Sequence, residues 1–258
     1  MRRFFLTDKI RPDGRVVLTG AEARHITSVC RLKFGQRIEL FDGKGNVYTA
    51  VLETAAKNSV TLVIDERRVE ISPERFPLTL AQSLLKGKKM DLVVQKATEL
   101  GVHALLPLES RYCENHGPHT RLLERWHRIV IEACKQCRRT RPMRILPVTD
   151  LAHADFSSFR HRLVAYEHEK MFALSKHFSE QPGPVCLVLG PEGGLHAEDL
   201  HTLQQWNFTV FSLGPLILRA ETAAVVATAI VRYLSGGFDP VNSPLTVDQS
   251  SGGPEDCV

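Results

Sequence analysis

Apolar and polar residues follow one pattern over residues 1–70 and another pattern after them. In the first part, short alternating runs separated by turn residues predict strands at residues 2–6, 15–18, 36–41, 47–52 and 60–66. Ala23, Ile26 and Val29 recur at helical spacing, which predicts one helix from residue 20 or 21 to residue 32. Short strands at this spacing indicate a small β-barrel domain over residues 1–70.

From residue 78 onward, the pattern predicts strands that alternate with helices. The strands are expected at residues 78–84, 102–108, 144–148, 162–166, 185–189 and 208–213, and the helices at 89–100, 120–139, 171–179, 197–205 and 220–234. This alternation indicates an α/β domain over residues 78–236, with a mostly parallel sheet that binds ligands at the carboxyl ends of its strands. Residues 71–77, with two prolines, predict a linker, and residues 237–258 predict a disordered tail.

Two predicted strands of the second domain run directly into glycine-proline turns. Leu189 is followed by Gly190-Pro191-Glu192-Gly193-Gly194, and Leu213 is followed by Gly214-Pro215. Such turns expose backbone amides and carbonyls with no Cβ in the way, so a flat polar ligand could bind against them. Each turn alone is typical of an ordinary strand-to-helix connection, but the repetition favours a ligand site.

The last predicted helix begins with polar side chains that point back toward these turns. Arg219, Glu221 and Thr222 stand in its first turn. Glu221 could instead complement the helix dipole, and Thr222 could cap the helix. Neither GxxxxGK[ST] nor GxGxxG occurs, which argues against a P-loop NTPase and a standard dinucleotide-binding fold.

Basic residues are concentrated in the first part of the chain. Residues 1–160 contain 28 Lys and Arg against 18 Asp and Glu, whereas residues 161–258 contain 5 against 11. The predicted helix at 120–139 carries Arg121, Arg125, Arg128, Lys135 and Arg139 at three- and four-residue spacing, with few acidic partners. A polyanion such as nucleic acid is the leading interpretation, with a solvated basic face as the alternative.

Cysteine pairs raise the possibility of structural zinc. Cys134 and Cys137 form a CxxC that follows Cys113-x-x-His116 at a compatible spacing. The amphipathic pattern places Cys137 on the apolar face of a helix, so packing is the favoured reading and no metal is expected. The six cysteines are too sparse for a disulfide scaffold. No apolar stretch of ~18 residues and no signal core occur, which predicts a cytoplasmic protein without membrane contact.

Several motifs, taken in order, resemble those of the RsmE-type uridine N3-methyltransferases of small-subunit ribosomal RNA, members of the SPOUT class. The resemblance covers residues 1 to about 237. Besides the two glycine-proline turns and Leu218 to Ala224, it rests on Arg2-Arg3-Phe4-Phe5, His25 with Val29 to Leu32, Leu40 to Gly43, Gln95 to Val102, and Arg125-Trp126 with Glu132 to Cys137.

The resemblance implies an α/β fold in which a small N-terminal PUA-like β-barrel precedes a C-terminal SPOUT methyltransferase domain with a trefoil knot. It also implies a homodimer, S-adenosylmethionine (SAM) as the only cofactor, and ribosomal RNA or the small ribosomal subunit as partner. Residues matching the SAM-binding positions are Leu189, Gly190, Gly193, Leu213, Gly214, Leu218 and Thr222.

The predicted chemistry uses two further groups. Arg219 is expected to stabilise negative charge on the uracil and Glu221 to orient the base. The predicted RNA contacts are Arg2, Arg3, Arg24, Arg31, Arg125, Arg128 and Arg139.

Two positions depart from the family pattern. Leu216 replaces a usual Arg or Lys, which removes one RNA or cofactor contact, and His196 replaces a usual Ser or Thr, which should weaken a helix cap. Leu216 is also the one hint of the alternative function, a non-catalytic RNA-binding or ribosome-assembly factor on the same fold.

Overall fold

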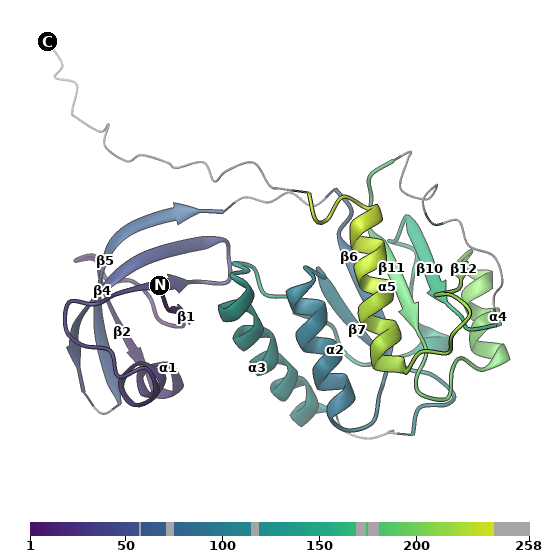
Figure 1. The fold of residues 1–258 in the computed structure, drawn as a ribbon, viewed down its shortest axis with the longest axis horizontal. Coiled ribbons are helices and arrows are strands. Elements are labelled where there is room, and N and C mark those ends of the chain that lie inside the picture. Colours follow the sequence, from purple (N-terminus) through teal and green to yellow (C-terminus); the bar gives the residue numbers. More distant parts are fainter. Residues whose placement is uncertain (57, 71–74, 115–118, 169–173, 175–180, 240–258) are drawn as a thin grey trace, which may run out of the picture. The chain divides into compact units, whose positions relative to one another are not determined.

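The chain divides into two compact units, residues 1–72 and residues 73–240, in a computed structural model (Figure 1). The structure describes residues 1–56, 58–70, 75–114, 119–168, 174 and 181–239. Of the helix predicted at 171–179, only Leu174 lies within these ranges. The first residues of the predicted linker and nearly all of the predicted tail also lie outside them. Every helix in the described residues is too short or too polar to cross a lipid bilayer.

The first unit is built on a five-stranded sheet. Its strands are β1 (Arg3–Phe5), β2 (Arg15–Thr19), β3 (Arg37–Phe41), β4 (Asn46–Ala55) and β5 (Ser59–Val69), in the order β1-β3-β4-β5-β2. β1 pairs with β3 in parallel, and the other pairs are antiparallel. Each strand lies where the alternating pattern predicts it, although β4 and β5 extend further. The β3–β4 turn is closed by Asp42, whose Oδ1 accepts hydrogen bonds from the amides of Lys44 (2.8 Å) and Asn46 (3.1 Å).

The predicted helix of this unit is shorter than expected. α1 (Gly20–Arg24) continues as one π-helical turn, His25–Val29, and ends there. Ala23 and Ile26 are fully buried in the core of this unit. The apolar residues recur at helical spacing because this face of the helix packs into the core. The helix stops because Arg31 adopts a left-handed backbone conformation, with φ of 49°, that a helix cannot continue through.

The second unit contains a parallel sheet in the order β12-β10-β11-β6-β7-β8, with β9 also pairing with β7. Its strands are β6 (Leu78–Ser83), β7 (Ala104–Glu109), β8 (Arg144–Ile145), β9 (Thr149–Asp150), β10 (His161–Ala165), β11 (Val185–Leu189) and β12 (Thr209–Phe211). β11 is buried at every position, as expected for an apolar strand covered on both faces. β9 and the 3-10 turn Leu151–His153 were not predicted, because they are too short to show a period.

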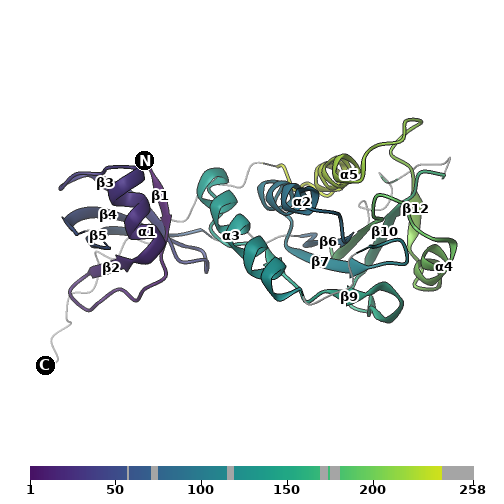
Figure 2. The same cartoon turned by 90° about the horizontal axis from the view of Figure 1, so that it is seen from below.

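Helices cover both faces of this sheet (Figure 2). They are α2 (Lys88–Glu99), α3 (Thr120–Cys137), α4 (Ala197–Gln205) and α5 (Ala220–Leu234). α2 and α5 lie on one face, with α3 packed against α2, and α4 lies on the other. On the α4 side, Leu203 and Phe208 pack with Phe156 and Val188 in one apolar cluster.

Candidate functional site

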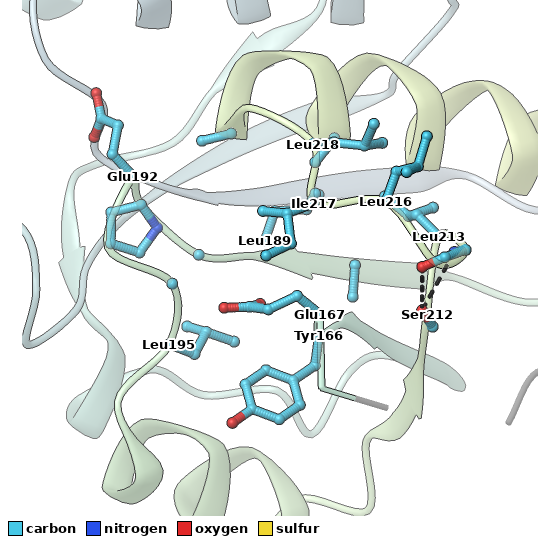
Figure 3. Close-up of a pocket in the computed structure, with 17 residues that line it drawn as sticks. Tyr166, Glu167, Leu189, Glu192, Leu195, Ser212, Leu213, Leu216, Ile217 and Leu218 are labelled. Carbon is cyan, nitrogen blue, oxygen red and sulfur yellow. Dashed lines mark hydrogen bonds between the residues drawn. The ribbon is translucent and has the colours of Figure 1, made fainter. Parts of the chain in front are cut away.

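Three loops at the carboxyl edge of the sheet enclose a pocket (Figure 3). β12, β10 and β11 are neighbours and run in parallel, so their carboxyl ends lie together. The loops that follow them surround an open cavity of about 670 Å³, counting space that is open to solvent. The glycine-proline turns predicted two of these loops. The third, at Tyr166 and Glu167, has no glycine signature and was missed.

Five of the seven residues predicted to contact SAM line this pocket. They are Leu189, Gly190, Leu213, Gly214 and Leu218. Gly214 has a φ of 113°, a conformation that favours glycine, and a Cβ added there would meet no atom within 4 Å. The backbone in this loop is therefore bare toward open space, as the sequence predicted.

Gly193 has a different surrounding from the one expected. It does not line the pocket, and a Cβ added to it would lie 3.3 Å from Cβ of Tyr112. The Tyr112 ring in turn packs edge-on against His196, with centroids 5.3 Å apart. The missing side chain at Gly193 thus makes room for Tyr112. Thr222, the other predicted contact outside the lining, is exposed in the first turn of α5.

The loop after β11 is hydrogen-bonded to the end of β6 and to the residues that follow β6. The fully buried Gln82 donates from Nε2 to the carbonyl of Gly190 (3.1 Å). Glu192 accepts hydrogen bonds from the amide of Lys86 (3.1 Å) and from Nζ of Lys89 (2.9 Å). Burial alone would raise the pKa of Glu192, but the bonds from Lys89 and Lys86 outweigh burial and hold that pKa below its usual range. These contacts position the pocket loop from more than 100 residues away in sequence.

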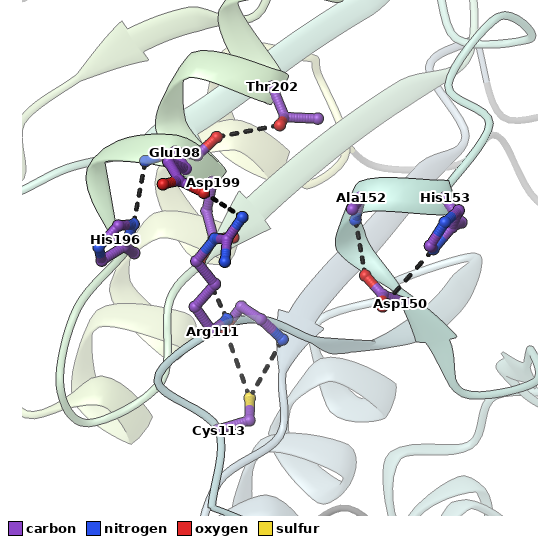
Figure 4. Close-up of polar contacts among 10 residues, drawn as sticks. Arg111, Cys113, Asp150, Ala152, His153, His196, Glu198, Asp199 and Thr202 are labelled. Atoms are coloured by element: carbon purple, nitrogen blue, oxygen red, sulfur yellow. Dashed lines mark hydrogen bonds and ion pairs between the residues drawn. The ribbon is translucent and has the colours of Figure 1, made fainter.

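The helix after this loop is preceded by His196, where the sequence predicts a weakened cap. The imidazole Nδ1 accepts a hydrogen bond from the amide of Glu198 at 3.1 Å, so a ring nitrogen caps α4 in place of a hydroxyl (Figure 4). The nearly buried Asp199 of the same turn accepts a bond from the amide of Arg111 (3.1 Å). α4 is thereby tied to the loop after β7.

The cysteines of the proposed zinc alternative have packing roles in the described residues. Cys134 is fully buried on α3, and the Cys113 thiol accepts from the amide of Ser110 at 3.4 Å. Within the described ranges, no three His, Cys, Asp or Glu side chains come together as a metal site. His116 lies outside those ranges.

The two predicted catalytic residues stand beside the pocket. Arg219 is exposed and directly precedes α5, between the pocket-lining Leu218 and Ala220. Glu221 follows in the first turn of α5. Its Oε2 is buried and accepts no hydrogen bond from any described residue, which leaves a carboxylate oxygen with unused bonding capacity at this position.

The predicted RNA contacts of the first unit separate into exposed and buried side chains. Arg2, Arg24 and Arg31 are exposed. A shallow basic hollow is lined by Arg2, Cys30, Arg31, Leu32, Lys33, Gln36 and Arg37. Arg3, however, is buried: its Nε lies 3.0 Å from Oε1 of Glu39, and its guanidinium lies over the Phe41 ring at 4.6 Å. Arg3 therefore stabilises the core of this unit, and we no longer count it among the predicted RNA contacts.

The predicted contacts of the second unit also differ from one another. Arg128 is exposed on α3, and Arg125, also exposed, pairs with Asp91 of α2. Arg139 donates to the carbonyls of Arg141 (2.6 Å) and Thr98 (3.2 Å). Arg128 is thus the most available of the three, while Arg139 also holds the end of α3 in place.

Comparison with known proteins agrees with this architecture. A sequence profile of an RNA methyltransferase domain matches residues 72–232, and a profile of an RNA methyltransferase PUA domain matches residues 18–65. The chain is 31% identical over 247 residues to the ribosomal RNA small subunit methyltransferase E of Mycobacterium tuberculosis, which spans 91% of this chain and 93% of the relative.

Solved structures show the same likeness. The ribosomal RNA small subunit methyltransferase E of Neisseria gonorrhoeae, bound to S-adenosyl methionine, has a TM-score of 0.80 at 30% identity and covers 91% of this chain and 98% of its own. A methyltransferase of Legionella pneumophila, solved with SAM, has a TM-score of 0.81 at 28% identity, with 90% and 96% covered. The fold and the profiles define an RNA methyltransferase. The chain belongs to the ribosomal RNA small subunit methyltransferase E family.

Proposed function

We propose that this chain transfers the methyl group of SAM to N3 of a uridine in small-subunit ribosomal RNA. The observation that carries the proposal is the pocket at the carboxyl edge of the sheet, built from three loops with bare glycine backbone and apolar side chains. Relatives of similar fold were solved with SAM, and a pocket of this kind suits a flat adenine and its ribose.

The residues present fit this cofactor. Leu189, Leu213 and Leu218 offer apolar contact for the adenine. The carbonyls of Gly190 and Gly214 already accept hydrogen bonds from Gln82 and Ser212, and each keeps a second lone pair for a ligand. Gly193 and Thr222 stand next to lining residues, where Gly193 shapes the loop by accommodating Tyr112. SAM supplies an electrophilic methyl group on a sulfonium.

The chain's own task is to prepare the uracil. The base must leave its stack, and its N3–H proton must pass to solvent water as the N3–CH₃ bond forms and the sulfonium C–S bond breaks. Arg219, exposed beside the pocket, would stabilise the negative charge that develops on the uracil. Glu221, whose Oε2 has no partner in the described residues, would contact the uridine and orient its base.

The RNA backbone would be held by side chains of both units. We propose Arg2, Arg24 and Arg31 in the first unit, and Arg125, Arg128 and Arg139 in the second. Arg3 is left out because Glu39 and Phe41 surround it. A cytoplasmic location follows from a ribosomal RNA substrate.

We further propose a homodimer and a trefoil-knotted chain path through the pocket loops, as in the SPOUT class. Large apolar side chains in and beside α5 support the dimer, since Leu216, Ile217 and Tyr233 are 76%, 84% and 71% exposed. Light scattering over a range of protein concentrations tests it. A monomer mass at every concentration would contradict the dimer.

Mapping of methylated nucleotides tests the function as a whole. Ribosomal RNA from cells that lack this protein should lose one N3-methyluridine, and the wild-type chain should restore it. Calorimetry with SAM distinguishes the alternative of a non-catalytic RNA-binding factor, which would show no SAM binding and no loss of methylation.

A further inference from the structure

The charged side chains that line the pocket are all acidic. Glu167 and Glu192 are the two charged residues among its lining, and no Lys, Arg or His of the described residues contributes to it. Glu192 is already bonded to Lys86 and Lys89. Within the described part of the chain, Glu167 has no hydrogen bond or ion pair, and it lines the pocket.

The carboxylate of Glu167 lies beside the neighbouring glycine turn. It directly follows β10, and its side chain lies near Leu189 and Leu195 in the pocket (Figure 3). A Cβ added to Gly194 would lie 2.5 Å from Oε1 of Glu167. The carboxylate thus lies against the bare backbone of Gly194, whose φ of 75° favours glycine at this position.

We infer that Glu167 makes the pocket prefer SAM over S-adenosylhomocysteine, the product that remains after methyl transfer. This rests on the proposed function. The two molecules differ by one methyl group and one positive charge, the sulfonium. A carboxylate in the pocket attracts the cation of SAM and loses that attraction when the methyl group leaves, so it favours binding of the donor and release of the product.

Calorimetry on the full-length chain tests this with three ligands. SAM and sinefungin both carry a positive charge near the reacting position, whereas S-adenosylhomocysteine does not. Because Glu167 is exposed and its charge is screened, Glu167→Gln should weaken SAM and sinefungin roughly three- to tenfold and S-adenosylhomocysteine less than about twofold. Glu167→Asp should keep part of the preference.

A matched control removes the same charge elsewhere. Glu124 is exposed on α3 and does not line the pocket, so Glu124→Gln should leave the affinities for all three ligands unchanged. Raising the ionic strength from about 0.05 to 0.5 M should reduce the preference for SAM in the wild type more than in Glu167→Gln.

Two results would overturn the inference. Equal weakening of all three ligands by Glu167→Gln would show that the carboxylate contacts a part they share, such as the ribose. Unchanged affinities would show that it contacts none of them. A wild-type chain that binds none of the three would instead defeat the proposed function, and the inference with it.

Discussion

The pocket of the second unit and the basic hollow of the first unit are lined by residues of different chemistry. The pocket is lined by glycine backbone, leucine side chains and two carboxylates, without a basic residue among the described positions. The hollow is lined by Arg2, Arg31, Lys33 and Arg37 with few apolar groups. One surface is complementary to a small ligand with a positive charge, and the other to a polyanion.

Because the two surfaces differ in this way, the small net charge of the chain, +4, describes neither of them. Binding in the pocket depends mainly on shape and backbone hydrogen bonds, so salt should affect it only weakly, through the charge of Glu167. Binding at the hollow depends on side-chain charge and should fall steeply as salt rises. Variants that change one surface should therefore leave the other intact.

The largest expected effect comes from Gly214→Val. Valine strongly disfavours the backbone conformation at Gly214, with its φ of 113°, so the loop must rearrange and the pocket loses its shape. We expect SAM affinity to fall at least ~100-fold, as measured by calorimetry, which corresponds to about 2.7 kcal/mol. Gly14→Val is the matched control, because Gly14 also has a positive φ (75°) but lies in the first unit. Unchanged SAM affinity in a folded Gly214→Val variant would remove this loop from the pocket.

Arg219→Ala should slow methyl transfer more than it weakens SAM binding. Its side chain is exposed next to the pocket and is not part of the pocket lining. Loss of charge stabilisation should cost roughly 2 to 4 kcal/mol, or on the order of 30- to 1000-fold in rate. Single-turnover methylation at saturating SAM and RNA isolates this step. A rate within a few-fold of wild type would reject the electrostatic role, and a loss due wholly to SAM binding would move Arg219 into the cofactor site.

The basic hollow should respond to salt rather than to SAM. If Arg2, Arg31 and Lys33 contact phosphates, replacing all three with alanine should reduce the slope of log K against log salt by about two to three units. Binding of a ribosomal RNA fragment at several salt concentrations measures the slope. The exposed Lys9, Arg11 and Lys44 of the same unit, which do not line the hollow, serve as a charge-matched control. Equal slopes in both triple variants would mean that the hollow has no special part in RNA binding.

The sequence predicted regular elements well where a period could accumulate. The bounds of α4, α5 and β11 agree with their predicted ranges. The turns at Gly190 and Gly214 were also predicted, because a predicted strand that ends in Gly-Pro indicates a turn with exposed backbone. Short elements such as β9 were missed, since two residues carry no period.

Contacts between distant segments could not be read from the chain. Gln82 and Gly190 are 108 positions apart, and nothing near either residue marks the hydrogen bond that joins them. Glu167 follows β10 without any glycine, so the third loop of the pocket gave no signal. Arg3 is a different case: strand alternation places Arg2 and Arg3 on opposite faces, and applying that period would have separated the exposed residue from the buried one.

The smallest expected effect distinguishes two glycines that look alike in sequence. Gly193→Ala should change SAM affinity less than about twofold, because Gly193 faces Tyr112 and has no positive φ that alanine would strain. The added methyl group crowds the Tyr112 side chain, so we expect a loss of about 0.5 to 1.5 kcal/mol in unfolding free energy, measured by urea denaturation. In a Tyr112→Ala background the same substitution should cost almost nothing, since the crowded partner is gone. A strong loss of SAM binding with unchanged stability would place Gly193 at the ligand after all.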